Sequence, residues 1–273
     1  MKYTKRILYT IAAAIVLCAC DNDYHPYSAG LTGSHDINTR NISLLEKADI
    51  ATPYKFAFIT DTQGALDDTA DALEIIKSRG DIDFIIHGGD ITDFGLPKEF
   101  IWGRDLLEST GLPFLTVIGN HDCLGNGEDT FNYIFGPQNF SLNIGHTHFV
   151  GLNTVALEYD YSHPVPDLDF IEADATGVAE LNKAEPGRIT HTVVVMHSRP
   201  YDEQFNNNVA KAFNLYLTGY PGCLCINGHN HSLDISDIFD NGIIYYQCPN
   251  IKKRTFFIFT MTDDGYEYET VEF

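Results

Sequence analysis

The fold is decided by residues 84–90, Phe-Ile-Ile-His-Gly-Gly-Asp, in which a short apolar run ends at two glycines and an aspartate. Similar apolar runs that end in polar residues occur upstream at residues 56–61 and downstream at residues 114–122. An apolar run of this length suits a β-strand that is buried on both faces. Residues 66–77 and 97–109, between these runs, have the spacing of helices. The alternation of strand and helix predicts a parallel sheet covered by helices, which is an α/β fold.

The second half of the chain continues with strand and helix patterns. Residues 140–144 and 148–153 alternate in hydrophobicity around Gly145, as the two strands of a hairpin do. The further predicted elements are helices over 167–182 and 208–217 and strands over 193–196, 224–226, 245–246, 256–262 and 266–271. The whole pattern predicts two stacked sheets with helices on the outside.

Polar side chains follow five of these apolar strands, at the point where each strand ends. They are Asp61 and Gln63, Asp90 and Asp93, Asn120 and His121, His197, and finally His229 and His231. In α/β sheets, ligand sites lie beyond the carboxyl ends of the strands, so we expect these side chains to converge. Mixed carboxylate and imidazole ligands suit divalent metal ions such as Mn, Fe or Zn. The set is larger than one ion needs, and a carboxylate shared by two ions about 3.5–4 Å apart would use all of it.

These clusters resemble the five ordered motifs of the calcineurin-like metallophosphoesterase family. The matching segments are Asp61-Thr62-Gln63, Gly89-Asp90-Ile91-Thr92-Asp93, Gly119-Asn120-His121-Asp122, His197 and Gly228-His229-Asn230-His231. The resemblance covers nearly all of the chain from Tyr54 onward and implies a four-layer α/β/β/α sandwich. It also implies a first metal ion on Asp61, Asp90 and His231. Asp90 would bridge to a second ion on Asn120, His197 and His229.

Gln63 departs from the family pattern, which usually has histidine at this position. An amide oxygen can coordinate a metal ion, but it is neutral and weaker than imidazole, which would shift the first site toward Mn or Mg. Two readings of Gln63 stay open: it binds the ion directly or through a water, or it is idle. The cofactors we expect are two divalent metal ions, Mn or Fe first, with Mg or Zn as alternatives.

The resemblance implies a metal-dependent phosphohydrolase that cleaves small phosphomonoesters, phosphodiesters or pyrophosphates. Two cations lower the pKa of a bridging water from about 15.7 toward 7, and the resulting hydroxide attacks phosphorus in line. His121 resembles the family's general acid, and Asp93 is placed to orient it. Arg199 is a candidate for binding a phosphate oxygen, with a plain surface arginine as the alternative. The rival function is a binding module on the same fold, weakened in catalysis by Gln63.

One further histidine pair, in Gly145-His146-Thr147-His148, imitates the last motif. Because it lies at the predicted hairpin turn, we expect it to be structural rather than part of the metal site.

The net charge limits the possible partners. The formal net charge of the chain is −21. Binding of nucleic acid requires a basic surface, so we expect no nucleic-acid partner. We expect a small phosphorylated substrate, because salt screens the distant acidic surface over a Debye length of roughly 8–10 Å and local metal cations can then dominate the potential inside a pocket.

The N-terminus has the features of a bacterial lipoprotein signal. A basic start precedes the apolar residues 7–17, a run too short to span a bilayer, and Cys20 follows small and apolar residues. We expect Cys20 to be lipidated, with a plain secretory signal as the alternative. The predicted protein is therefore an exported lipoprotein of the cell envelope, anchored at the periplasmic face or the outer surface. The predicted divisions are a lipoprotein signal peptide (residues 1–19), a tether with a short helix over 42–48 (residues 20–52) and a metallophosphoesterase domain (residues 53–273).

Overall fold

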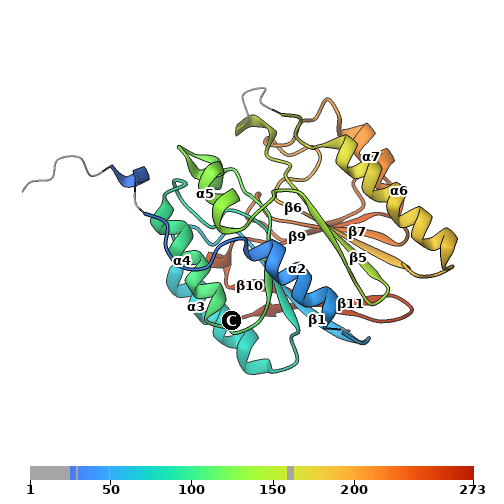
Figure 1. Ribbon diagram of the computed structural model, residues 1–273, viewed down its shortest axis with the longest axis horizontal. Helices are drawn as coiled ribbons and strands as arrows, with labels where there is room; N and C mark the ends of the chain where they lie inside the picture. The colour runs from blue at the N-terminus through green and yellow to red at the C-terminus, as the bar shows by residue number, and fades with distance from the viewer. Residues whose placement is uncertain (1–24, 29, 49, 159–162) are drawn as a thin grey trace, which may run out of the picture.

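The computed structural model describes residues 25–28, 30–48, 50–158 and 163–273, and Cys20 with the predicted signal peptide lies outside these residues. Two mixed sheets stack face to face (Figure 1). No helix in the described part of the chain is long and apolar enough to cross a lipid bilayer.

The first sheet has five strands in the order β11-β10-β1-β2-β3. Its strands are β1 (Tyr54–Ile59), β2 (Phe84–His87), β3 (Phe114–Thr116), β10 (Thr255–Met261) and β11 (Tyr266–Glu272). β1, β2 and β3 are parallel, whereas β10 and β11 add antiparallel pairs at one side. The parallel part is the one expected from the strand–helix–strand repeat.

The second sheet has six strands in the order β4-β5-β6-β7-β9-β8. Its strands are β4 (Phe140–Ile144), β5 (Thr147–Leu152), β6 (His191–Met196), β7 (Cys223–Asn227), β8 (Asp234–Ser236) and β9 (Ile244–Gln247). β5, β6, β7 and β9 are parallel, and β4 and β8 close the two edges as antiparallel strands.

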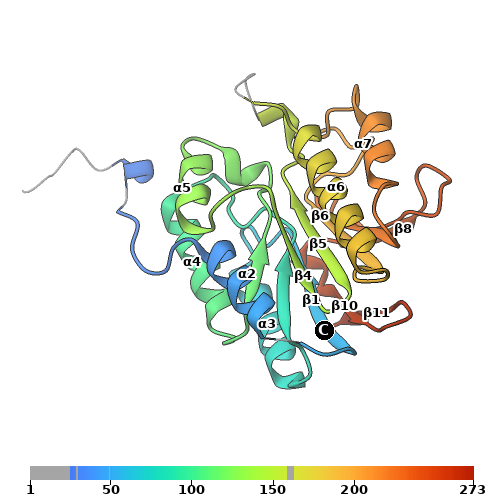
Figure 2. The same cartoon turned by 45° about the vertical axis from the view of Figure 1, so that its right-hand side comes forward.

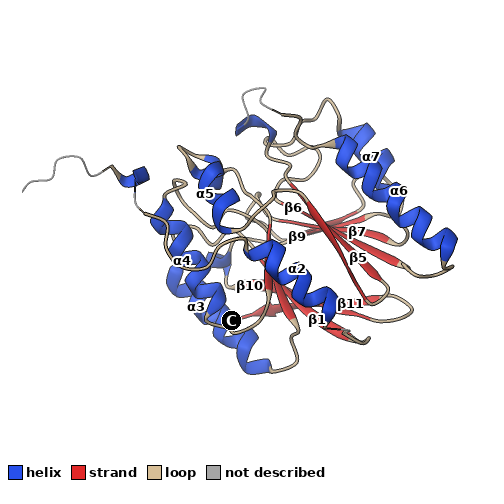
Figure 3. Cartoon of the chain, viewed as in Figure 1, coloured by secondary structure: helices blue, strands red, loops and turns tan. Residues whose placement is uncertain are grey.

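Helices cover the outer face of each sheet, as Figures 2 and 3 show. On the first sheet these are α3 (Leu66–Arg79), α4 (Pro97–Glu108) and α5 (Gly127–Ile134), and on the second α6 (Leu168–Ala184) and α7 (Ala210–Leu217). The short 3-10 helices are η1 (Pro26–Ser28), η2 (His121–Cys123), η3 (Ala156–Glu158) and η4 (Ile251–Lys253). The predicted α/β fold of two stacked sheets with outer helices is confirmed.

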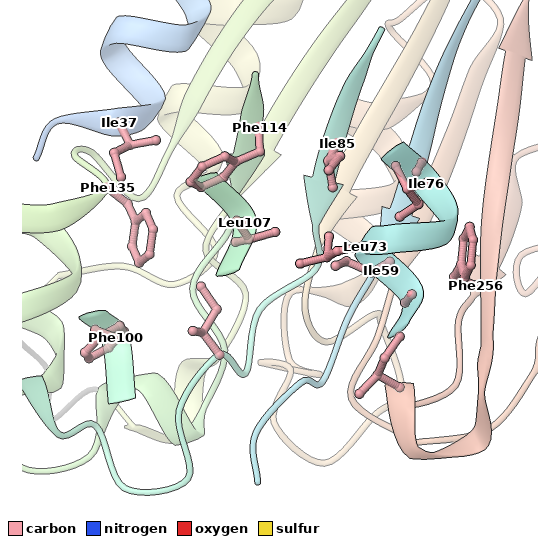
Figure 4. Close-up of a cluster of buried hydrophobic side chains, with 14 of the residues drawn as sticks. Ile37, Ile59, Leu73, Ile76, Ile85, Phe100, Leu107, Phe114, Phe135 and Phe256 are labelled. Carbon is pink, nitrogen blue, oxygen red and sulfur yellow. The ribbon is translucent and has the colours of Figure 1, made fainter. Parts of the chain in front are cut away.

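Alternation along β1 shows how the sequence builds these layers. Phe56 and Phe58 point between the sheets, where they pack with residues of both sheets such as Phe149. Ala57 and Ile59 point to the other face, toward the outer helices. Figure 4 shows this outer cluster, with side chains of the sheet beside those of α3 and α4. Because both faces are buried along residues 56–59, this part of the strand is apolar at every position, and polar residues follow directly at its carboxyl end.

Part of the predicted tether packs on the first sheet as α2 (Ile37–Lys47), which begins five residues before the helix expected over 42–48. The side chain of Asn38, in this helix, forms two hydrogen bonds with the edge strand β3. Its Nδ2 donates to the carbonyl of Thr116 at 2.8 Å, and its Oδ1 accepts from the Thr116 amide at 3.0 Å. Ile37 and Leu45 are buried beneath the helix.

Candidate metal centre

Five strand ends meet at one edge of the stacked sheets, and they bring the predicted metal ligands together. Asp61 and Gln63 follow β1, Asp90 and Asp93 follow β2, Asn120 and His121 follow β3, His197 follows β6, and His229 and His231 follow β7. Parallel strands in both sheets end on the same side, which is why residues far apart in the sequence become neighbours here.

The first ligand group lies around Asp61, Asp90 and His231. One ligand atom from each of these residues lies within 4.8 Å of the others. Oδ1 of Asp61 is 3.1 Å from Nε2 of His231. Gln63 belongs to the same group, because its Nε2 is 3.4 Å from Oδ2 of Asp90.

The second ligand group lies around Asn120, His197 and His229. The amide oxygen of Asn120 is 3.1 Å from Nε2 of His197 and 3.0 Å from Nδ1 of His229. Nε2 of His197 is also 3.3 Å from Oδ2 of Asp90. Oδ2 of Asp90 therefore faces both groups, which is the position of a bridging carboxylate.

Four of these residues have left-handed backbone conformations that are uncommon for residues with a Cβ. The φ angles are 52° at Asp61, 58° at Asp90, 74° at His229 and 53° at His231. Each such residue costs on the order of 1–3 kcal/mol and persists only where surrounding contacts enforce it. The ligand side chains are therefore held in place by the folded loops.

Two motif glycines leave room for the carboxylates. A Cβ on Gly119 would lie 2.2 Å from Oδ1 of Asp90, and a Cβ on Gly228 would lie 2.3 Å from Oδ2 of Asp61. Real Cβ atoms do not approach oxygen this closely, so any side chain at either position would displace a candidate ligand.

Asp122 supports the site and was given no role by the sequence reasoning. Its buried carboxylate accepts four backbone hydrogen bonds, from the amides of Asp90 (2.9 Å), Ile91 (3.0 Å), Thr92 (2.9 Å) and Gly119 (3.0 Å). Burial raises the pKa of the Asp122 carboxyl, and the nearby Asp90 charge raises it further. The acidic residue directly after His121 was the signal for this role. Asp122 ties together the loops after β2 and β3.

Gln247, at the end of β9, supports the last motif in a similar way. Its Oε1 accepts from Nδ2 of Asn230 at 3.0 Å, and its Nε2 donates to the carbonyl of Ser232 at 3.0 Å. Asn230 also donates to Oδ1 of Asp202 at 2.6 Å. The residue between His229 and His231 is thus fixed on two sides.

The buried carboxylates and imidazoles of the site shift one another's pKa values. Burial would lower the pKa of His197, but the Asp90 and Asp61 carboxylates raise it to about 10. Burial opposes ionisation of Asp61, yet the neighbouring His231 and His197 hold its pKa below the usual value. The imidazoles therefore offset the negative charge of two buried carboxylates. A bound divalent cation would offset the same charge.

The donor set fits a metal ion. Oε1 of Gln63 is buried and accepts no hydrogen bond from any described residue, and the buried Oδ1 of Asp61 accepts none either, its 3.1 Å contact being the ion pair with the candidate ligand His231. A buried oxygen without a partner costs about 1–3 kcal/mol. Both oxygens lie in the group that also contains Asp90 and His231, so a cation bound there would satisfy them.

His121 and Asp93 lie together, but through a different atom from the one expected. Nδ1 of His121 is 2.9 Å from the backbone carbonyl oxygen of Asp93, rather than from its carboxylate. A carbonyl can only accept, so Nδ1 carries the hydrogen and Nε2 is the nitrogen left for proton transfer. The amide of His121 also donates to Oδ1 of Asp90 at 2.9 Å, which holds His121 beside the bridging position.

The guanidinium of Arg199 is engaged with protein carboxylates. Nη1 donates to Oδ2 of Asp234 at 2.6 Å, and Nε lies 3.8 Å from Oδ1 of Asp202. A phosphate would have to compete with both acids, so phosphate binding by Arg199 stays a prediction.

His148 lies apart from the ligand groups, as expected for a structural residue. Its Nε2 is 2.8 Å from Oδ2 of Asp174 on α6, and its Nδ1 is 2.7 Å from Oδ1 of Asn143 on β4. These bonds tie α6 to the hairpin formed by β4 and β5.

Comparisons with known proteins agree with this geometry. The family model of the calcineurin-like phosphoesterases matches residues 54–233. The fold is similar to that of a dimetal phosphatase from Danio rerio, with a TM-score of 0.65, 12% identity and coverage of 81% of this chain and 98% of that one. It is also similar to GAP50, the anchor in the inner membrane complex of Plasmodium, with a TM-score of 0.58, 15% identity and coverage of 80% and 84%.

A third similar structure is the purple acid phosphatase PPD1 from yellow lupin, with a TM-score of 0.57, 13% identity and coverage of 82% of this chain and 54% of that one. At these identities the likeness shows the fold alone. No curated protein matches the chain.

Proposed function

Because the chain belongs to the calcineurin-like phosphoesterase family, we propose that it is a metal-dependent phosphohydrolase acting on small phosphomonoesters, phosphodiesters or pyrophosphates. The observation that carries this proposal is Asp90, whose Oδ2 faces His197 of one ligand group and Gln63 of the other. One carboxylate shared by two groups is the arrangement that a pair of divalent ions requires.

The residues around the site have separable roles in this proposal. Asp61, Gln63, Asp90 and His231 would hold one ion, and Asp90, Asn120, His197 and His229 would hold the other. Bound metal ions would supply a water nucleophile at neutral pH and positive charge for the phosphoryl oxygens. In its doubly protonated form, His121 would give the proton on Nε2 to the leaving oxygen, while the hydrogen on Nδ1 stays bonded to the Asp93 carbonyl and orients the ring.

Hydrolysis of p-nitrophenyl phosphate and of bis(p-nitrophenyl) phosphate tests the proposal. Protein stripped with a chelator should be inactive, and Mn²⁺ should restore turnover of at least one ester. Protein that binds two equivalents of Mn²⁺ but hydrolyses neither these esters nor a panel of nucleotides and sugar phosphates would instead support the rival function, a binding module on the same fold. The observation that favours this rival is the presence of Gln63 in a ligand group, because its amide oxygen is a neutral metal ligand.

Gln63 leads to a prediction about metal affinity. We expect Gln63→His to bind Mn²⁺ more tightly than the unmodified protein, because imidazole is a stronger donor than an amide oxygen. Gln63→Ala should bind one ion more weakly by roughly 10–100-fold, as loss of a ligand or its support typically does. Calorimetric titration with Mn²⁺ and the Mn²⁺ dependence of activity measure both effects. Identical midpoints in all three proteins would mean that residue 63 is idle.

We further propose that the protein is exported and held at the cell envelope by a lipid on Cys20, which follows the apolar segment of residues 7–17. Cys20→Ser is then expected to move the protein from the membrane fraction to the soluble fraction, because the acyl chains provide most of the membrane affinity. Cys18→Ser, two residues earlier, is the matched control and should stay with the membrane. Fractionation followed by immunoblotting distinguishes these outcomes, and a Cys20→Ser protein that remains membrane-bound would contradict the anchor.

A further inference from the structure

Phosphate recognition at the rim of the site requires a cation that is not already paired. Arg199, the cation selected from the sequence, is bound to Asp234 and lies near Asp202. Lys252 differs, because it forms no hydrogen bond and no ion pair within 4.0 Å with any of the residues that the structure describes. Lys252 is exposed, so its ammonium can meet a ligand from solvent.

The backbone places Lys252 beside the first ligand group. It lies in η4 (Ile251–Lys253), which follows β9, and the amide of Ile251 donates to the carbonyl of Asp61 at 3.4 Å. The ammonium of Lys252 lies 3.3 Å from the point that a Cβ on Gly64 would occupy. Gly64 directly follows the candidate ligand Gln63. Lys252 therefore lies beside the residue that directly follows a candidate metal ligand.

Gly64 opens the space in which this ammonium lies. Its φ is +59°, a conformation that favours glycine, and it has no side chain to cover the rim. Oδ2 of Asp93 lies 2.9 Å from the same Cβ point, so a carboxylate and an ammonium approach it from two different loops. The backbone carbonyl of Asp93 contacts Nδ1 of His121 at 2.9 Å, which places this rim beside the proposed proton donor.

We propose that Lys252 binds an oxygen of the substrate phosphate at the rim and selects substrates whose phosphate carries two negative charges over monoanionic diesters. This assignment rests on the proposed function of the same site. In a chain with a formal net charge of −21, a dianion approaches against repulsion, and a local unpaired ammonium offsets that repulsion. The ammonium is a mobile point charge on a long stem, so it can follow the phosphate without fixed geometry.

Binding of inorganic phosphate to the Mn²⁺-loaded protein tests the assignment without requiring turnover. Lys252→Ala is expected to raise the Kd of phosphate by about 10-fold, the scale of a lost hydrogen bond to a charged group. Lys252→Glu should raise it further, and Lys252→Arg should retain most of the affinity. Lys253→Ala is the matched control, since Lys253 is the next exposed lysine of η4, and its Kd should equal that of the unmodified protein. Equal Kd values for Lys252→Glu and Lys253→Ala would overturn the assignment.

Steady-state kinetics test the selectivity. For p-nitrophenyl phosphate, Lys252→Ala should raise KM by about 10-fold and leave kcat nearly unchanged, because a contact at the rim stabilises the bound substrate and the transition state equally. For bis(p-nitrophenyl) phosphate the change in kcat/KM should be several-fold smaller. Equal losses for both esters would overturn the charge selectivity. If the unmodified protein hydrolyses neither ester while phosphate affinity still depends on Lys252, the proposed hydrolysis fails and the binding role of Lys252 stands.

Discussion

Asp90→Asn is expected to lower kcat by about 10²–10³-fold while the fold is retained, on the scale of losing an essential electrostatic contact in an active site. The substitution preserves the size of the side chain and the acceptor for the His121 amide, which lies 2.9 Å from Oδ1. It removes the negative charge between His197 and Gln63. Without that charge, two cations cannot be held close together. Kinetics at saturating Mn²⁺, with metal content measured on the same sample, give the result.

Asp240→Asn is a suitable control for this experiment. Asp240 is exposed and has a left-handed φ of 55°, close to the 58° of Asp90, but it lies in the turn after β8 and outside both ligand groups. Its substitution should leave kcat and metal content unchanged. An Asp90→Asn protein that carries two metal ions and turns over normally would refute the two-metal arrangement.

Asp122→Ala is expected to reduce the free energy of unfolding by at least about 3 kcal/mol and to reduce activity as well. The substitution leaves four backbone amides, those of Asp90, Ile91, Thr92 and Gly119, without their acceptor. Unsatisfied buried groups cost about 1–3 kcal/mol each, and solvent entry would recover part of that cost. The loops after β2 and β3 would then separate. Urea denaturation measures the stability, and a Mn²⁺ titration measures the effect on the site.

Two comparison variants show whether this effect belongs to the buried carboxylate. Asp129→Ala removes an exposed carboxylate from α5 nearby and should change the free energy of unfolding by less than about 0.5 kcal/mol. Asp122→Asn keeps the shape but replaces one acceptor with a donor, so it should also be destabilising. Wild-type stability in Asp122→Ala would show that the four amides find other acceptors, and the supporting role of Asp122 would then be wrong.

Local pattern was enough to predict the layers of the fold. Runs such as residues 84–86 are apolar at every position because both faces of a central strand are buried. Such a run can be recognised from the sequence alone. Patterns failed for two short elements, α5 and β8. β8 has three residues and pairs only with the edge of β9, and α5 has eight residues that begin at a glycine. Three residues are too few to show alternation in β8, whereas Thr130, Phe131 and Ile134 of α5 are buried at helical spacing, so the pattern of this helix was present in the sequence and was missed.

The candidate ligands were also found from the sequence, because each follows directly after a buried strand and parallel strands end at a common edge. The hydrogen-bond partners of those residues could not be predicted from the sequence. Whether Asp93 contacts His121 through its carboxylate or its carbonyl depends on a turn after β2, and only the folded chain shows the carbonyl in place.

The roles of Asp122, Gln247 and Lys252 likewise depend on tertiary structure. Gln247 and Asn230 are 17 residues apart, and Lys252 comes close to a glycine that precedes it by most of the chain. A sequence by itself determines where the backbone is buried and where it turns, since these follow from neighbouring side chains. Contacts between loops are decided by strand order and register, because these set which strand ends lie side by side and which side-chain atoms come within bonding distance.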